Sequence, residues 1–237
     1  TINENSTPGT AEPNPIVVEA ALAMFGYLGQ CIEEKRKDPG DDVLSRILAL
    51  TGDDAWTNEE ILGLTWLITL AGLDTVMGAI GFLMLHLARN PDLRKRGIAD
   101  PESIGRVVEE VLRLEPPAPT NDRVTNREVT VCGVTIPADA SVVLRIGSAN
   151  RSDTRESPDA IDLDQNERAH VTFGGGIHRC LGSHLARREL RLVVEEFHKL
   201  IPEYELAPGY EPEVVWPSGT LHLTTLPLVF PVAGPVG

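Results

Sequence analysis

The chain has 237 residues, of which 42% are hydrophobic and 24% are charged. These values describe one globular domain, or at most two, and they exclude a disordered or collagen-like chain. The 21 basic residues are outnumbered by 35 acidic ones, and the resulting net charge of -14 argues against nucleic acid as a partner.

The N-terminal part of the sequence predicts two helices and no secretory signal. Residues 1–15 are polar and rich in Pro and Asn, so we expect a loose leader there. From Ile16 to Lys37 apolar residues recur at helical spacing, and a short helix is predicted from Asp41 to Leu50. We expect residues 16–237 to form one domain.

The longest predicted helix begins at Thr57, which forms a capping box with Glu60, and it ends at Asn90. Its segment Ile61–Ala88 is apolar enough to be compared with a membrane span. Asp74 lies in the middle of this segment, where a charge costs about 2.5–3.5 kcal/mol on insertion scales. We therefore expect no membrane span and a helix buried in a large fold.

The rest of the chain combines helices with short strands. A helix is predicted over Ser103–Leu114, a hairpin over Val129–Ile136 and a strand over Ser141–Ile146. A polar segment over residues 150–172 is long enough to indicate a functional loop. A last helix over Leu181–Leu200 precedes a tail of short strands. The predicted fold class is mainly α with small antiparallel β-sheets.

The segment FGGGIHRCLG, residues 173–182, places a cysteine after a glycine-rich loop and at the start of a helix. The positive end of the helix dipole favours the thiolate of Cys180, and the glycines allow close backbone approach. Such a thiolate suits either a nucleophile or the axial ligand of a metal cofactor. Spacing alone does not identify His178 as the base that a nucleophile needs.

The three cysteines, Cys31, Cys132 and Cys180, are far apart and form no CxxC pair. This pattern argues against a disulfide framework or a structural zinc site. A reducing compartment, the cytoplasm, is the expected location.

FGGGIHRCLG resembles the haem-ligand signature FxxGxHxCxG of cytochrome P-450 enzymes at every fixed position. Residues 71–75, AGLDT, are similar to the oxygen-binding stretch of that family, and residues 110–113, EVLR, match its ExxR pair. The resemblance covers the chain from Ile16 to the tail and is strongest to soluble bacterial members. It implies the cytochrome P-450 fold, represented by its C-terminal haem-binding part with the N-terminal half absent.

The resemblance implies a role for several residues around a haem b. Cys180 would be the thiolate ligand of the iron, and His178 and Arg123 would each contact a haem propionate. Asp74 and Thr75 would relay protons to bound dioxygen. Their alternative role is local, with Thr75 bonding back to a helix carbonyl and Asp74 pairing with an arginine. Further positions implied to contact the cofactor are Ala71, Gly72, Phe173, Gly174, Gly182 and Ala186.

The resemblance also implies that Glu110 and Arg113 form a buried structural pair. They would hold their helix to the loop that precedes the cysteine, with an arginine from residues 162–168 as third partner. Gln165 stands at the position expected for that arginine, and Arg168 is the nearest substitute.

Basic residues cluster near the cysteine at Arg179, Arg187, Arg188 and Arg191. They predict a docking patch for an acidic ferredoxin-type electron donor; the alternative is a solvated helix face that neutralises Glu189 and Glu195. Leu67, Leu70 and Pro119 are expected to line part of a substrate pocket.

The implied activity is a monooxygenase reaction, which inserts one oxygen atom from dioxygen into an apolar small molecule with electrons from NAD(P)H. The alternative is a haem-binding or structural fragment without catalysis, because the N-terminal half of a family member is absent. For the same reason we expect uncovered apolar helix faces and self-association of the chain.

Overall fold

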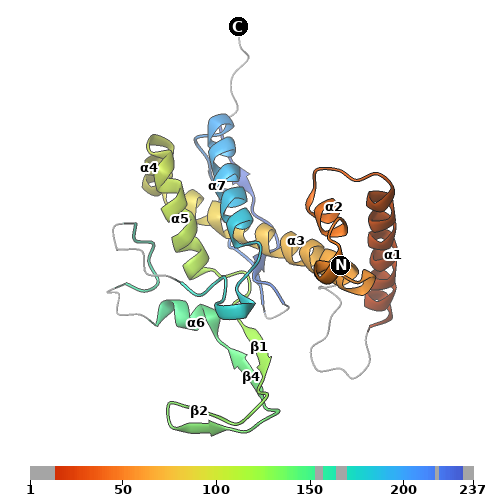
Figure 1. Cartoon of the computed structure of the whole chain (residues 1–237). Coiled ribbons are helices and arrows are strands. Elements are labelled where there is room, and N and C mark those ends of the chain that lie inside the picture. The colour runs from red at the N-terminus through yellow and green to blue at the C-terminus, as the bar shows by residue number, and fades with distance from the viewer. Residues whose placement is uncertain (1–13, 153–156, 164–169, 217–218, 232–237) are drawn as a thin grey trace. The chain divides into compact units, whose positions relative to one another are not determined.

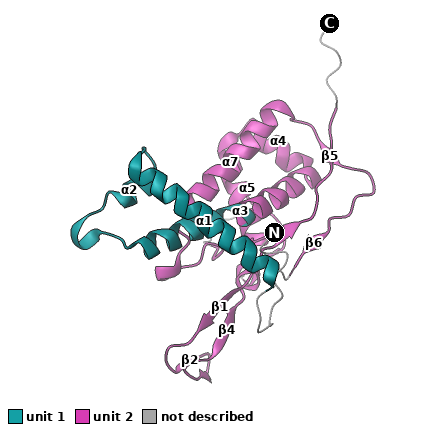
Figure 2. Cartoon of the chain, turned by 90° about the vertical axis from the view of Figure 1, so that its right-hand side faces the viewer, with its two compact units in different colours: residues 1–74 teal, residues 75–237 magenta. Residues whose placement is uncertain are grey.

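The computed structural model describes residues 14–152, 157–163, 170–216 and 219–231. The chain divides into two compact units, Thr1–Asp74 and Thr75–Gly237, which Figure 2 distinguishes by colour. The predicted leader, residues 1–15, lies outside the described residues except for its last two positions, where the first helix begins.

The first unit contains α1 (Pro15–Lys37), α2 (Val43–Leu48), the short 3-10 helix η1 (Gly52–Asp54) and the first half of α3 (Asn58–Arg89). The side chain of Asn14 caps α1 by accepting the N–H of Ile16 at 3.0 Å. The rings of Phe25 and Trp66 stack with centroids 4.1 Å apart, which joins α1 to α3.

The helix α3 is 32 residues long and begins with the predicted capping box. Thr57 donates its N–H to the Glu60 carboxylate at 2.8 Å, and Glu60 donates its N–H to the Thr57 hydroxyl at 3.2 Å. The second half of α3, from Gly78 on, is largely buried, whereas Leu67 and Met77 are 58% and 62% exposed. The expected burial therefore holds for the second half of this helix.

Two helices, α1 and α3, are long and apolar enough to pass a length-and-hydropathy test for membrane spans. Core helices of soluble proteins pass the same test. Large apolar side chains are also exposed on α1, among them Leu22 and Tyr27. The expected self-association of the chain stays a prediction.

The helices of the second unit are the rest of α3, α4 (Pro91–Ala99), α5 (Pro101–Leu114), α6 (Ile146–Arg151), the short 3-10 helix η2 (Gly176–His178) and α7 (Ser183–Leu200). Figure 1 shows α5 and α7 side by side. Their apolar faces, with Val107 and Val111 on α5 and Leu190 and Val194 on α7, pack with the buried half of α3 into one core. The helices α4 and α6 were not predicted from the sequence; Ile146, expected to end a strand, begins α6.

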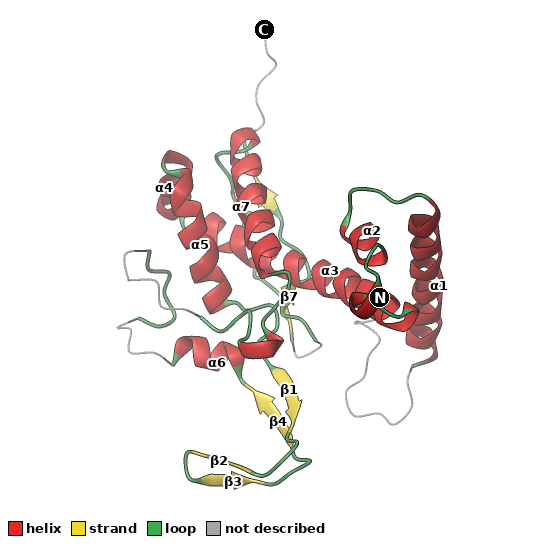
Figure 3. Ribbon diagram, viewed as in Figure 1, coloured by secondary structure: helices red, strands yellow, loops and turns green. Residues whose placement is uncertain are grey.

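The strands form antiparallel pairs, as the expected fold class requires (Figure 3). The hairpin β2 (Val129–Val131) and β3 (Val134–Ile136) is confirmed, and it is flanked by β1 (Asn121–Val124) paired with β4 (Ser141–Leu144). The remaining pairs are β5 (Glu205–Leu206) with β8 (Leu228–Val229) and β6 (Val214–Val215) with β7 (His222–Leu223). Helix-rich architecture with small antiparallel sheets is thus observed.

A buried histidine in α7 makes the stability of the second unit depend on pH. His198 lies within 3.0 Å of the Tyr204 hydroxyl, and Arg94 packs 4.4 Å from the centroid of the Tyr204 ring. Burial, and secondly the charge of Arg94, lower the pKa of His198. The unfolded chain therefore binds a proton at His198 at a pH where the folded protein does not.

We predict that the free energy of unfolding falls as the pH drops below about 6.5, the ordinary pKa of histidine, because unfolding then releases His198 to be protonated. His198→Phe should reduce the difference in unfolding free energy between pH 8 and pH 5, measured by urea titration. The same substitution at exposed His184 should leave the difference unchanged. An undiminished difference in His198→Phe would contradict the assignment.

Candidate haem-binding site

The site is built on the C-terminal end of α5, where Glu110 and Arg113 form a buried pair. Arg113 donates from Nε and Nη2 to the two carboxylate oxygens of Glu110, both at 3.0 Å. The arginine is 2% exposed and the glutamate 9%. The spacing of three residues places both side chains on one helix face, so the pair forms within α5.

The remaining donors of Arg113 bind the segment that follows α6. Arg113 donates to the carbonyls of Pro158 at 2.6 Å and Ala160 at 2.9 Å, and the N–H of Asp162 donates to Glu110 at 3.2 Å. The pair therefore ties α5 to this segment. The expected third partner falls on Gln165 or Arg168, which lie outside the described residues.

The entry to the cysteine loop is held by Asn150 and Thr172, two residues that the analysis of the sequence missed. The buried amide of Asn150 donates to the carbonyl of Arg113 at 3.1 Å and to the Thr172 hydroxyl at 2.8 Å, and it accepts the N–H of Val171 at 2.9 Å. The Thr172 hydroxyl donates to the carbonyl of Leu112 at 2.7 Å. Residues 171 and 172 are thus fixed to the end of α5.

The cysteine loop closes on itself between Phe173 and Cys180. The N–H of Cys180 donates to the carbonyl of Phe173 at 2.8 Å. Gly174 has a φ of +66°, which favours glycine, and a Cβ there would lie 3.3 Å from the His178 carbonyl oxygen. The helix α7 begins at Ser183, two residues later than predicted, and Gly182 is its N-cap. Cys180 therefore precedes the helix and lies exposed in a turn.

A second ion pair, between Glu109 and Arg187, joins α5 to α7 beside this loop. Arg187 donates from Nε at 2.6 Å and from Nη2 at 2.9 Å to the Glu109 carboxylate. His170 Nε2 lies 3.0 Å from the same carboxylate, and the Arg187 guanidinium lies 4.4 Å from the centroid of the Phe173 ring. The sequence carries no local signal for this pair, because its members are 78 positions apart.

The two ion-pair partners stabilise each other's charged forms. Burial by itself would raise the pKa of Glu109, but hydrogen bonds from His170 and Arg187 outweigh it and lower the pKa to about 2. The hydrogen bond to Glu109 in turn raises the pKa of Arg187, with a smaller contribution from the charge of Cys180. Both groups are therefore ionised at neutral pH.

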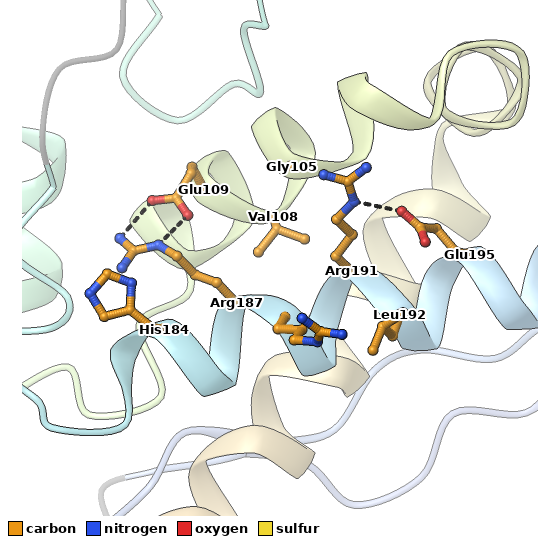
Figure 4. A pocket seen from close by; sticks show the side chains of 9 residues that line it. Gly105, Val108, Glu109, His184, Arg187, Arg191, Leu192 and Glu195 are labelled. Carbon is orange, nitrogen blue, oxygen red and sulfur yellow. Dashed lines mark hydrogen bonds and ion pairs between the residues drawn. The ribbon is translucent and has the colours of Figure 1, made fainter.

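An open groove of about 700 Å³ lies between α5 and α7 (Figure 4). Arg191 is paired with Glu195 at 2.6 Å and with Glu102 at 2.9 Å, and the pair with Glu195 is drawn in the figure. These contacts of Arg191 agree with the alternative to a docking patch, which is a helix face where arginines and glutamates neutralise each other. Arg179 and Arg188 are exposed and form no ion pair within the described part of the chain. The groove is lined by Gly105, Val108, Glu109, His184, Arg187, Arg188, Arg191, Leu192 and Glu195.

The other predicted site residues are distributed over both units. On α3, Ala71, Gly72 and Asp74 belong to the first unit and Thr75 to the second. Arg123 is exposed on β1, where it donates to the carbonyl of Asp122 at 2.7 Å. Leu67 and Leu70 also lie on α3. Pro119 precedes β1, and its carbonyl accepts the N–H of Gly147. His178 is the last residue of η2, and Ala186 lies in the first turn of α7.

The surroundings of Cys180 fit an axial haem ligand. Cys180 is the single cysteine of residues 173–182, and its side chain is exposed and forms no disulfide. A haem would need one sulfur ligand for its iron from this loop, and Cys180 would supply it. Ile177 and Leu181, 96% and 77% exposed, offer apolar surface next to Cys180 for a flat apolar ring.

The fold and this loop define the class of the protein: a helical protein with a cysteine loop of the haem-thiolate type. The sequence model of the cytochrome P450 family matches residues 104–217. The chain belongs to the cytochrome P450 family, and residues 110–113 and 173–182 both lie inside the match.

Individual relatives agree with this assignment. The chain is 38% identical to cytochrome P450 130 of Mycobacterium tuberculosis over 91% of its own length and 54% of the relative's. It is 39% identical to the vitamin D(3) 25-hydroxylase of Pseudonocardia autotrophica over 84% of its own length and 50% of the relative's. A solved structure of a mutant of P450 EryK with erythromycin B matches with a TM-score of 0.87 and 30% identity, covering 100% of this chain and 62% of that one. The chain thus spans about half the length of the curated relatives it matches.

We predict that Arg113→Met destabilises the protein by about 3–5 kcal/mol, because it leaves the Glu110 carboxylate buried without its partner. Urea unfolding monitored by circular dichroism measures this loss. Arg188→Met, which removes an exposed arginine of α7, should change the free energy of unfolding by less than about 0.5 kcal/mol. Equal stability of Arg113→Met and the unaltered chain would contradict a structural role of the pair.

Proposed function

We propose that this chain is the haem-binding part of a cytochrome P450 monooxygenase that inserts one oxygen atom from dioxygen into an apolar small molecule. The observation that carries the proposal is the exposed Cys180, held on a glycine loop that is fixed to the end of α5. Family membership and the hydroxylase name of one relative support the reaction class. The cysteine usage and the bacterial relatives support a cytoplasmic location.

In this proposal the loop residues bind and orient the cofactor. When bound, the haem supplies the iron at which dioxygen is activated. Cys180 would hold that iron through its thiolate. Gly182 leaves room beside the Cys180 sulfur, from which a Cβ would lie 4.0 Å away, and Gly174 supplies the positive φ that the loop requires. His178 and Arg123 bind the propionates through charge-assisted hydrogen bonds, for which their exposed side chains are suited.

Residues on α3 are proposed to act on bound dioxygen and to contact the substrate. Ala71 and Gly72 present little side-chain volume, and Asp74 and Thr75 hold and move protons with their carboxylate and hydroxyl. Leu67, Leu70 and Pro119 contribute apolar surface for the substrate. The hydroxylation of vitamin D(3) named for one relative agrees with an apolar substrate class.

A ferredoxin-type donor is proposed to dock at Arg179 and Arg188. Both side chains are exposed; Arg179 directly precedes Cys180 in the chain, and Arg188 lines the groove between α5 and α7. Arg191 is left out of this proposal because Glu195 and Glu102 already neutralise it. An acidic partner would be attracted to these two charges, which form no ion pair with any other residue that the structure describes.

We predict that the chain titrated with haemin gives the ferrous carbon-monoxide spectrum of thiolate ligation, and that Cys180→Ser abolishes it. Only Cys180 follows the glycine loop; Cys31 lies in α1 and Cys132 in the β2–β3 turn. Cys31→Ser and Cys132→Ser should therefore keep the spectrum. A thiolate spectrum that persists in Cys180→Ser, or that is missing from the unaltered chain, would refute the proposed ligand. Thiolate ligation without turnover would instead favour a non-catalytic haem-binding protein.

We predict that charge reversal of Arg179 and Arg188 together slows reduction of the haem-loaded chain by an acidic ferredoxin at low salt and flattens the salt dependence of the rate. Opposite charges chiefly increase association rates, and salt screens them. Stopped-flow absorbance measures the rate. The matched control reverses Lys95 and Arg127, which changes the net charge equally at exposed positions on α4 and in the β1–β2 loop. Equal slowing by both double variants would indicate a general effect of charge and would rule out docking at this patch.

A further inference from the structure

The ion pair between Glu109 and Arg187 lies outside the sequence motifs, yet a continuous chain of contacts leads from it to Cys180. Glu109 on α5 accepts two hydrogen bonds from Arg187 on α7, as Figure 4 shows. The guanidinium of Arg187 lies over the ring of Phe173, with 4.4 Å between its central carbon and the ring centroid. The carbonyl of Phe173 accepts the N–H of Cys180 at 2.8 Å.

We propose that Arg187 and Glu109 are positioning residues that hold the Cys180 loop in the conformation it presents to the haem. The inference rests on the proposed function, because the ligand role of Cys180 is what makes the loop conformation matter. Neither residue is proposed to contact the haem or the substrate. Each acts through Phe173 and His170 on the loop.

The chemistry of arginine suits this position. A planar guanidinium can form a two-point hydrogen-bonded pair with a carboxylate through one edge and lie over an aromatic ring with its face. Arg187 makes both contacts, and its side chain is 31% exposed. A lysine would keep the charge but would lose the two-point geometry and the flat contact with Phe173.

A second path through His170 connects Glu109 to the start of the loop. His170 Nδ1 accepts the N–H of Thr172 at 3.3 Å, and Nε2 of the same ring is hydrogen-bonded to the Glu109 carboxylate at 3.0 Å. The His170 side chain is only 5% exposed. Glu109 therefore links His170, which precedes the loop, to Arg187, which packs on the ring of Phe173 at the start of the loop.

The test measures amide hydrogen exchange at Gly174 and Cys180 in the haem-free chain. The N–H groups of both residues are hydrogen-bonded within the loop, to the carbonyls of Val171 and Phe173. Loss of the cation–π contact in Arg187→Met should speed their exchange by roughly three- to tenfold. Arg187→Lys and Glu109→Gln should give smaller increases, and the milder lysine variant keeps the test informative if Arg187→Met does not fold.

Arg191→Met is the matched control. Arg191 also joins α7 to α5, through its pair with Glu102, but it has no ring contact with Phe173 in the part of the chain that the structure describes. Its loss should leave exchange at Gly174 and Cys180 unchanged. Unchanged exchange in Arg187→Met, or an equal increase in Arg191→Met, would overturn the proposal.

A second measurement uses the haem-loaded chain and separates this proposal from the proposed function. In Arg187→Met a larger fraction of the ferrous carbon-monoxide complex should show the spectrum of lost thiolate ligation than in Arg191→Met. Equal fractions would overturn the positioning role while leaving haem ligation by Cys180 intact. A chain that never shows thiolate ligation would refute the proposed function and the haem-related role together, whereas the exchange data would still report whether Arg187 orders the loop.

Discussion

The buried pair of Glu110 and Arg113 is the interaction on which the surroundings of Cys180 depend. A guanidinium that is 2% exposed requires acceptors for its donors, and the carboxylate and the carbonyls of Pro158 and Ala160 provide them. Because removing any partner would leave a buried charge uncompensated, the segment after α6 is held close to the end of α5. Asn150 and Thr172 then attach the entry of the cysteine loop to the same helix end.

Two neighbouring glutamates on α5 serve two different elements. Successive residues of a helix point about 100° apart, so Glu109 and Glu110 face in different directions. Glu110 binds Arg113 and the backbone of Asp162, whereas Glu109 binds Arg187 on α7 and His170. One turn of α5 thereby contacts the segments on both sides of the cysteine loop.

The neighbouring arginines of α7 differ in whether a carboxylate binds them, although the sequence places them in one basic cluster. Arg187 and Arg191 are both bound by carboxylates, while Arg188 between them is exposed and has no ion pair among the described residues. In the sequence Arg188 and Arg191 belong to one basic cluster. They differ in the structure because Arg191 pairs with Glu102 on α5 as well as with Glu195. For this reason the proposed docking patch contains Arg179 and Arg188 but not Arg191, which the sequence-based hypothesis included.

The sequence by itself determined the features that depend on neighbouring residues. Apolar periodicity, the capping box of Thr57 with Glu60 and the glycine–cysteine segment predicted α1, α3, α5 and the loop at Cys180, because helices, caps and turns form by bonds within a few positions. Only the tertiary structure decided which residues meet across long separations. Asn150 with Thr172, and Glu109 with Arg187, are 22 and 78 positions apart, and the short helices α4 and α6 carry too few apolar residues for a periodic pattern. Such contacts and short elements are stabilised by the packing of the whole unit, so no local pattern in the sequence records them.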